Sequence, residues 1–184
     1  MFPKLMICLC ALVMALTAAP VAVLADEAVS NILVVETTKG KFRIEMRPDL
    51  APKHVARIKE LVAAKFYDGS KFHRVIEGFM AQTGDPSGTG SGGSGQRIPA
   101  EFNAAPHLRG TVSMARASDP NSADSQFFIC YDAAPSLNNN YTVWGQVISG
   151  MEVVDKLNKG PSENNGIVPN PDKILRIRFA EAAK

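Results

Sequence analysis

Alternation of apolar and polar residues near the start of the chain predicts a β-hairpin. Phe42, Ile44 and Met46 alternate with charged residues, which is the period of a strand with one face in a core. The polar segment 37–40 separates this strand from the apolar run 32–35. The two runs therefore predict paired strands at the beginning of a folded domain.

The pattern then changes from the period of a strand to that of a helix. In residues 51–64, Val55, Ile58 and Val62 lie on one stripe of a helical surface. Pro52 suits the first helical position, where its missing N–H has no partner to lose. One amphipathic helix is predicted here.

Beyond Gly69 the apolar runs become short, and loops rich in Gly, Ser and Asn separate them. These runs predict strands at residues 72–76, 79–82, 111–115, 126–131 and 143–147. Residues 151–157 predict a second, short helix. Leu175, Ile177 and Phe179 alternate with arginines and predict a last strand with these three apolar side chains on one face.

Many short strands with only two helices indicate an all-β sandwich or barrel in which the helices act as lids. Side chains fill the interior of a small barrel, so a ligand would bind on its outer face or in a groove. Neither an internal repeat nor a second domain is visible in the sequence.

The first 25 residues have the layout of a secretory signal peptide, with one lysine, an apolar run and small residues ending at Ala25. The sequence therefore predicts a signal peptide at 1–25, a single domain at 26–184 and a periplasmic or secreted location, without stable membrane contact after cleavage. The alternative is a retained membrane anchor, because the apolar stretch 5–24 is just long enough to span a bilayer. Pro20 and the small residues favour cleavage.

Composition excludes several classes of function. The formal net charge of +2 falls to +1 without Lys4, and no basic tract is present, so nucleic acid is not an expected partner. Loss of the leader would leave only Cys130, which excludes an internal disulfide. His54, His73 and His107 have no ligand-like spacing and no cysteine beside them, so no metal site is predicted.

Two sequence blocks carry the candidate chemistry. Residues 72–85 read FHRVIEGFMAQTGD and place one cation, Arg74, among large apolar side chains with almost no other ionisable group nearby. A site of this kind can bind a neutral, partly apolar ligand and polarise it. The second block, residues 113–129, begins with SMAR and ends with SQFFI.

In these blocks the chain resembles the cyclophilins, peptidyl-prolyl cis-trans isomerases whose pattern reads FHRVI-x-GFM-x-Q-x-GD and, in bacterial forms, SMAR followed by SQFF. The resemblance spans roughly residues 31–179. It implies a closed eight-stranded antiparallel β-barrel capped by two α-helices, in agreement with the strand and helix pattern. It also implies an isomerase that needs no cofactor and acts on proline-containing polypeptides, here unfolded or exported chains. We expect a monomer, because a closed barrel leaves few exposed strand edges.

The resemblance also implies a role for each site residue. Arg74 would be catalytic, since its guanidinium stays charged at any working pH and offers several fixed N–H donors. His73 would be a hydrogen-bonded framework residue near the site. The residues expected to bind substrate are Phe79, Met80, Gln82, Ala115, Arg116, Gln126, Phe128, Leu137 and Tyr141.

Ser136 departs from the family pattern, because many relatives carry Trp or Phe there. With that aromatic wall missing, we expect weak binding of cyclosporin, the family's cyclic peptide inhibitor. A competing hypothesis is a binding module or holdase chaperone that uses the same groove without turnover.

Overall fold

The predicted hairpin opens the fold. Strand β1 (Ile32–Thr37) turns back into β2 (Gly40–Met46), and the register pairs buried Val35 with buried Phe42. Helix α1 (Pro52–Ala63) follows, with its proline in the first turn as predicted. In this computed structural model residues 30–181 are described; the predicted signal peptide, residues 1–25, lies outside them.

Short strands make up most of the remaining chain, as the short apolar runs predicted. They are β3 (Arg74–Ile76), β4 (Met80–Thr83), β5 (Thr111–Met114), β6 (Phe127–Cys130), β7 (Val143–Ser149) and β8 (Ile174–Phe179). The other helical segments are α2 (Met151–Asp155) and two single 3₁₀ turns, η1 (Pro135–Leu137) and η2 (Ser162–Asn164).

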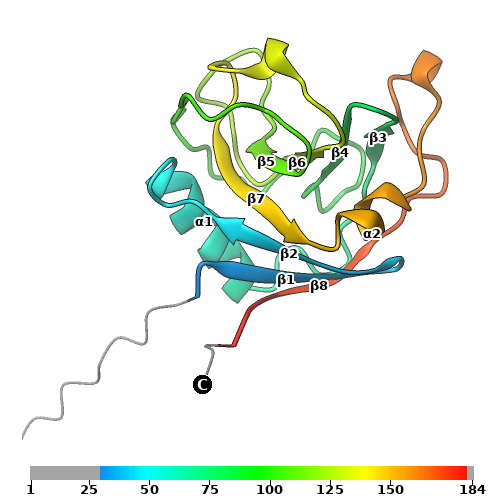
Figure 1. Ribbon diagram of the computed structural model, residues 1–184, viewed down its shortest axis with the longest axis horizontal. Coiled ribbons are helices and arrows are strands. Elements are labelled where there is room, and N and C mark those ends of the chain that lie inside the picture. The colour runs from blue at the N-terminus through cyan, green and yellow to red at the C-terminus, as the bar shows by residue number, and fades with distance from the viewer. Residues whose placement is uncertain (1–29, 182–184) are drawn as a thin grey trace, which may run out of the picture.

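The eight strands form one antiparallel sheet in the order β3-β4-β6-β5-β7-β2-β1-β8 (Figure 1). The sheet curls into a half-barrel, so the predicted barrel fold is present but its predicted closure was overstated. Between the first and last strands, β3 and β8, there is no ladder; the isolated bridge Lys71–Lys173 and a hydrogen bond from the Gly69 N–H to the Ile174 carbonyl oxygen at 2.8 Å join the segment before β3 to the start of β8. We call the gap between β3 and β8 the seam.

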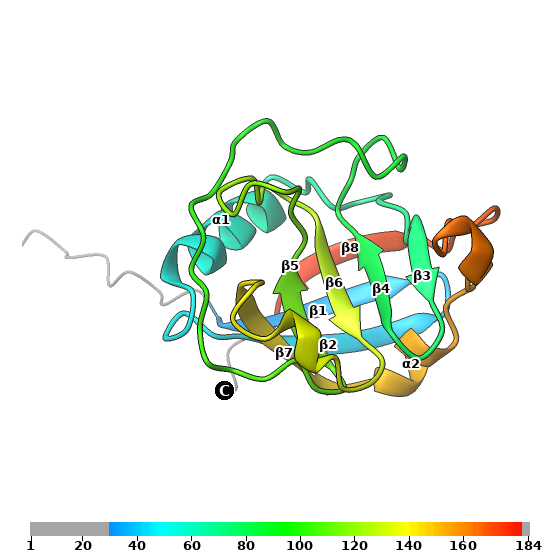
Figure 2. The same cartoon turned by 90° about the horizontal axis from the view of Figure 1, so that it is seen from above.

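The two α-helices cover opposite ends of the half-barrel (Figure 2). Val55, Ile58 and Val62 of α1 are buried in the core, as their helical spacing predicted. Val153 and Val154 of α2 reach the same core from the other end.

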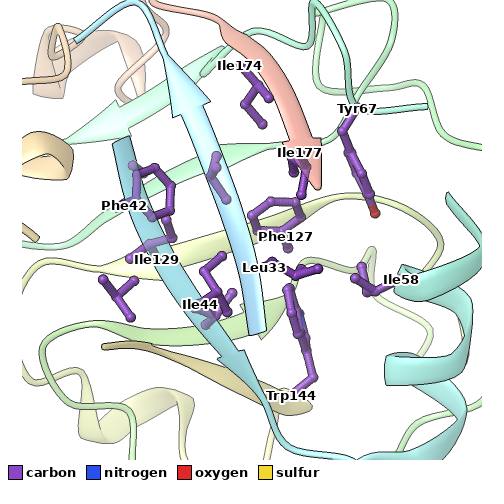
Figure 3. Packing of buried hydrophobic residues seen from close by; sticks show 14 of the residues in the cluster. Leu33, Phe42, Ile44, Ile58, Tyr67, Phe127, Ile129, Trp144, Ile174 and Ile177 are labelled. Carbon is purple, nitrogen blue, oxygen red and sulfur yellow. The ribbon is translucent and has the colours of Figure 1, made fainter. Parts of the chain in front are cut away.

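Large side chains fill the inside of the barrel (Figure 3). Trp144 is fully buried and meets Phe127 edge-on, with 5.5 Å between ring centroids. Phe127 meets Tyr67 in the same way at 5.5 Å, and the Tyr67 hydroxyl donates to the Ser125 carbonyl oxygen at 3.0 Å. Since no space for a ligand remains inside, the binding surface has to lie outside the barrel.

One residue of the last strand does not lie where simple alternation predicts. Ile177 is 3% exposed, whereas Leu175 is 55% exposed. The pairing with β1 shifts between Glu36 and Thr37, so Leu175 is the extra residue of a β-bulge and turns toward solvent.

Helix α1 is capped by a residue from far along the chain. Ala51 precedes the helix and offers no side-chain cap. The Glu101 carboxylate accepts hydrogen bonds from the backbone N–H groups of Lys53 and His54, at 3.0 and 2.9 Å, and contacts the His54 ring Nδ1 at 2.7 Å. Glu101 thereby ties the long β4–β5 connection to the helix. Across residues 30–181, no helix has the length and apolar character needed to span a membrane.

Candidate active site

The two sequence blocks meet because their strands are neighbours in the sheet. Across β3, β4, β6 and β5, the register aligns Arg74 with Gln82, Gln82 with Phe128, and Phe128 with Ser113. Phe127 points into the barrel core, whereas Phe128 belongs to a second, smaller cluster with Met80 and Cys130. Alternation along β6 therefore separates a core face from an outer face that carries the candidate site.

A pocket of about 180 Å³ opens on this outer face. Phe128 is 5% exposed, and Tyr141 packs edge-on against it with 5.8 Å between ring centroids. The pocket brings together nine of the predicted site residues: Arg74, Phe79, Met80, Gln82, Ala115, Arg116, Phe128, Leu137 and Tyr141.

The tenth predicted contact residue, Gln126, lies in an adjoining hollow of about 370 Å³. Gln82, Ala115 and Arg116 line both spaces, so the two form one continuous surface. The glycine-rich loop, which we define as residues 85–95, contributes Gly90 to Gly93 to the wall of the hollow.

Neutral oxygen atoms hold the guanidinium of Arg74. Its Nε and Nη2 donate to the backbone carbonyl and side-chain Oδ1 of Asn165, at 3.0 and 2.9 Å. Its Nη1 donates to Gln82 Oε1 at 3.2 Å and lies 3.8 Å from Met80 Sδ. Partial burial lowers the pKa of Arg74 from its usual value of 12.5, which leaves the group charged near neutral pH.

A relay of hydrogen bonds runs from Arg74 to the glycine-rich loop. Gln82, which accepts from Arg74, donates through Nε2 to Gln126 Oε1 at 2.8 Å. Gln126 in turn donates to the carbonyl oxygens of Gly90 and Gly92, at 3.0 and 2.8 Å. Each amide accepts on one side and donates on the other, so the relay fixes the orientation of both glutamines.

The buried side chain of Asp85 anchors the backbone of the glycine-rich loop. Its fully buried carboxylate accepts from the backbone N–H groups of Ser87, Thr89 and Gly90, at 2.8, 3.0 and 2.6 Å. Burial alone would raise the pKa of Asp85, but hydrogen bonds from Ser87, Gly92 and Gly90 lower it well below its usual value of 3.8. The loop therefore surrounds a permanent anion, and a Cβ at Gly92 would collide with it.

Two buried histidines lie near the pocket. His107 contacts Ser113 Oγ at 3.0 Å and Asn138 Oδ1 at 3.1 Å, and its ring stacks behind Phe128 with 6.1 Å between centroids. The ring of His73 is 6% exposed and makes no hydrogen bond of regular geometry among residues 30–181, although the Lys71 backbone and the Gln126 side chain lie close enough to it to oppose the lowering of its pKa. A Cβ on Gly90 would lie 3.5 Å from this ring, so His73 supports the glycine-rich loop by packing. Burial lowers the pKa of both rings, which favours their neutral forms.

Arg116 reinforces the opposite wall of the pocket. Its guanidinium lies 4.7 Å from the centre of the Tyr141 ring and donates from Nε and Nη2 to the Asn140 carbonyl oxygen, at 3.0 and 2.9 Å. Its Nη1 donates to the Ala117 carbonyl oxygen at 2.9 Å. The side chain thus holds the segment before Tyr141 in place, while its backbone stays next to Ala115 at the mouth of the pocket.

Sequence reasoning missed Asn165, Asp85 and His107 as parts of the site. The Asn165-Gly166 pair is a turn signal, but nothing in the sequence places that turn against Arg74. Asp85 ends the first block, and its place in that pattern does not indicate that it anchors the glycine-rich loop. No three His, Cys, Asp or Glu side chains of the described part of the chain are grouped so as to hold a metal ion.

A protein-family model described as cyclophilin type peptidyl-prolyl cis-trans isomerase/CLD matches residues 32–179. The chain belongs to the cyclophilin family. A relative from Brucella suis, named a probable peptidyl-prolyl cis-trans isomerase, is 50% identical over 166 residues, which cover 84% of this chain and 85% of the relative. A peptidyl-prolyl cis-trans isomerase from Synechococcus elongatus is 46% identical over 152 residues, covering 82% of this chain and 97% of that protein. This cyclophilin is therefore a peptidyl-prolyl cis-trans isomerase, as the two sequence blocks predicted.

Solved structures agree with the fold. A cyclophilin from Cryptosporidium parvum superposes on this cyclophilin with a TM-score of 0.76 at 30% identity, covering 84% of this chain and 99% of that one. A second structure of the Cryptosporidium parvum protein, in the presence of the dipeptide Ala-Pro, gives a TM-score of 0.75 at 32% identity. The half-barrel with two helices is thus the family's architecture.

Proposed function

We propose that this cyclophilin accelerates X-Pro rotation by stabilising the twisted amide, with Arg74 as the donor to the prolyl nitrogen and without a covalent intermediate. The observation that carries the proposal is the setting of the guanidinium. It is bound by two carbonyl-type oxygens of Asn165 and one of Gln82, and no carboxylate of residues 30–181 pairs with it. Its charge is therefore available to a neutral substrate in the pocket.

The chemistry needs a site that favours the transition state over both planar isomers. Resonance opposes rotation with a barrier of about 18–20 kcal/mol, and the uncatalysed exchange takes tens to hundreds of seconds. In the twisted state the prolyl nitrogen loses conjugation and exposes its lone pair. A donor aimed at that lone pair, in an apolar pocket, stabilises the twisted state selectively.

Magnitudes show that Arg74 supplies only a part of the catalysis. Shortening an exchange of about 100 seconds to about a millisecond takes roughly 7 kcal/mol. One hydrogen bond from a charged group contributes about 1.5–3 kcal/mol. The remainder would come from holding the proline ring against Phe128, Leu137 and Tyr141 while the peptide on the other side of the bond turns.

The substrate peptide would lie extended at the mouth of the pocket. In this proposal its backbone adds as a strand beside Ala115 and Arg116, and Gln82 and Gln126 present polar side chains to it. The substrates are proline-containing segments of unfolded or exported polypeptides. No cofactor takes part, and the enzyme acts as a monomer.

The signal-peptide layout of residues 1–25 supports a periplasmic or secreted location. The mature N-terminus of the protein, isolated from cells that express the full chain, tests this part. A terminus at Asp26 agrees with cleavage and export. A terminus at Met1 would favour the membrane anchor instead.

The mechanism is tested by measuring cis-trans exchange of a short X-Pro peptide by NMR. We expect Arg74→Ala to lower kcat/KM roughly 10- to 150-fold, which corresponds to about 1.5–3 kcal/mol. The kcat/KM of Arg74→Lys should lie between those of the wild type and Arg74→Ala, because an ammonium group keeps the charge but loses the planar arrangement of N–H donors. Arg178→Ala, which removes an exposed arginine of β8, serves as the matched control. Full activity of Arg74→Ala would refute the donor mechanism and leave the isomerase assignment standing.

A further inference from the structure

Asn165 approaches the site from a distant part of the chain. It follows η2 in a segment that we call the edge loop, residues 158–168, and it lies 91 positions after its partner Arg74. The edge loop is docked on β3: Val75 donates to the Gly166 carbonyl at 2.8 Å, and Gly160 donates to the Val75 carbonyl at 2.9 Å. These bonds hold the loop backbone independently of the Asn165 side chain.

The contact between Asn165 and Arg74 uses one edge of the guanidinium. Nε and Nη2 form that edge, and they donate to the Asn165 carbonyl oxygen and Oδ1, at 3.0 and 2.9 Å. Nη1 is left on the side of Gln82 and Met80, both of which line the pocket. A bidentate contact of this kind fixes the rotation of the planar group about its long axis.

Backbone conformation explains why asparagine suits this position. Asn165 has φ of 51°, in the left-handed region, which asparagine enters more readily than most residues. In this conformation its own carbonyl oxygen and its side-chain oxygen both reach the same guanidinium. The side chain is also a neutral acceptor, so it orients Arg74 without neutralising the charge.

We propose that Asn165 is a positioning residue that holds Arg74 with Nη1 directed at the prolyl nitrogen of the substrate. This inference rests on the donor role of Arg74 proposed above. Asn165 acts on turnover and leaves the binding of the planar ground state unchanged, since it lines neither the pocket nor the adjoining hollow. Its removal should lower kcat and leave KM within twofold.

Asn165→Gly is the most informative substitution, because glycine keeps the left-handed backbone and the carbonyl acceptor and removes the side chain that carries Oδ1. We expect kcat to fall roughly tenfold, because a misplaced catalytic group loses much of its effect. Asn165→Asp keeps the shape and adds a carboxylate that pairs with Arg74, and it should lower kcat as well. Lys65→Gly is the control: Lys65 also has a left-handed backbone, with φ of 58°, but lies in neither space of the site.

The double variant separates positioning from a general effect on the fold. When Arg74 is already alanine, Asn165→Gly should change kcat less than twofold. An equal loss in both backgrounds would show that the effect passes through the edge loop rather than Arg74, and would overturn the inference. If Arg74→Ala is impaired but Asn165→Gly has an unchanged kcat, the positioning role of Asn165 is overturned and the donor mechanism stands. If Arg74→Ala is fully active, both the donor mechanism and the positioning role are overturned.

A spectroscopic measurement is independent of folding losses. The Nε–H signal of Arg74 in NMR should exchange slowly with water in the wild type, because Nε–H is hydrogen-bonded. In Asn165→Gly the retained carbonyl should keep this signal, while rotation about the Cζ–Nη2 bond should become faster. Equal Nη2 rotation in wild type and variant would contradict a clamp by Oδ1.

Discussion

Substitution of Glu101 should destabilise the fold through the start of helix α1. Its carboxylate serves the N–H groups of Lys53 and His54 and the His54 ring, in a helix with no cap of its own. In Glu101→Ala all three groups lose their partner, and His54 is fully buried, so water cannot readily replace it. In Glu101→Gln one acceptor oxygen remains, but the negative charge at the helix N-terminus is lost.

The expected loss can be worked from these contacts. Loss of a helix cap costs about 1 kcal/mol, and loss of a hydrogen bond to a charged group costs about 1.5–3 kcal/mol. Because the contributions overlap, we expect about 3 kcal/mol for Glu101→Ala and about 1–2 kcal/mol for Glu101→Gln. At about 2–4 °C per kcal/mol for a domain of this size, Glu101→Ala should lower Tm by about 6–12 °C.

Denaturant unfolding followed by the fluorescence of the single, buried Trp144 measures this loss. Glu60→Gln is the control, because Glu60 pairs with Arg57 on the surface with a side chain that is 62% exposed. The control should change the free energy of unfolding by less than about 0.5 kcal/mol. A loss below about 1 kcal/mol in Glu101→Ala would refute the idea that this carboxylate caps the helix.

The pH dependence of stability follows from the same pair. Burial lowers the pKa of His54 below 6.5, although Glu101 opposes the shift. The contribution of His54 to the free energy of unfolding is therefore complete above about pH 6.5 and is lost as pH falls through the pKa of the folded ring. Burial would raise the pKa of Glu101, but hydrogen bonds from His54 and Lys53 lower it below 4.5. Its contribution is complete above the unfolded value and is lost as pH falls through the folded one. The wild-type free energy of unfolding should therefore fall with acidification below about pH 6.5, because of His54, and again below about pH 4.5, because of Glu101. Glu101→Gln should lose the pH dependence in the lower of these two ranges.

The remaining predictions concern packing, reactivity and inhibitor binding. Ile177→Ala should cost about 2–5 kcal/mol of unfolding free energy, whereas Leu175→Ala, on the exposed bulge, should stay within about 0.5 kcal/mol; similar losses in denaturant unfolding would contradict the bulge. Burial raises the pKa of the Cys130 thiol to about 12, so Cys130 in the native protein should resist a thiol reagent at pH 8 and react only on unfolding; rapid labelling of Cys130 in the native protein, located by peptide mass spectrometry, would argue against that burial. Ser136→Trp should tighten cyclosporin binding at least tenfold in calorimetry, since an indole beside Leu137 adds a large apolar surface; no gain would mean that Ser136 is not the missing wall.

The sequence predicted the parts of the fold that depend on local pattern. The hairpin and α1 follow from alternation and helical spacing, and most strands begin or end within two residues of the observed bounds. Alternation predicted the wrong face for Leu175, because a β-bulge depends on pairing with the partner strand and has no signal in the local sequence. The open seam is likewise a property of strand curvature and pairing between distant segments.

The grouping of Arg74, Gln82 and Phe128 on one surface was predictable from the two long motifs that carry them. Contacts between distant loops could not be predicted from the sequence. Glu101 reaches His54 across 47 positions and Asn165 reaches Arg74 across 91, and each is an ordinary polar residue in its own neighbourhood. The packing of the His73 ring beneath Gly90 is likewise a contact that the local sequence does not show.

The seam leaves β3 with a sheet neighbour on one side only, and exposed strand edges promote pairing between molecules and aggregation. In this cyclophilin the edge loop occupies that side: Gly166 and Gly160 satisfy both backbone groups of Val75, and Val168 donates to the His73 carbonyl at 3.0 Å. The segment that carries Asn165, the proposed positioning residue for Arg74, is therefore also the one that shields the strand from other chains. Selection on this loop would act on solubility and turnover at once, so changes that loosen it should appear first as aggregation in the crowded setting of newly made protein.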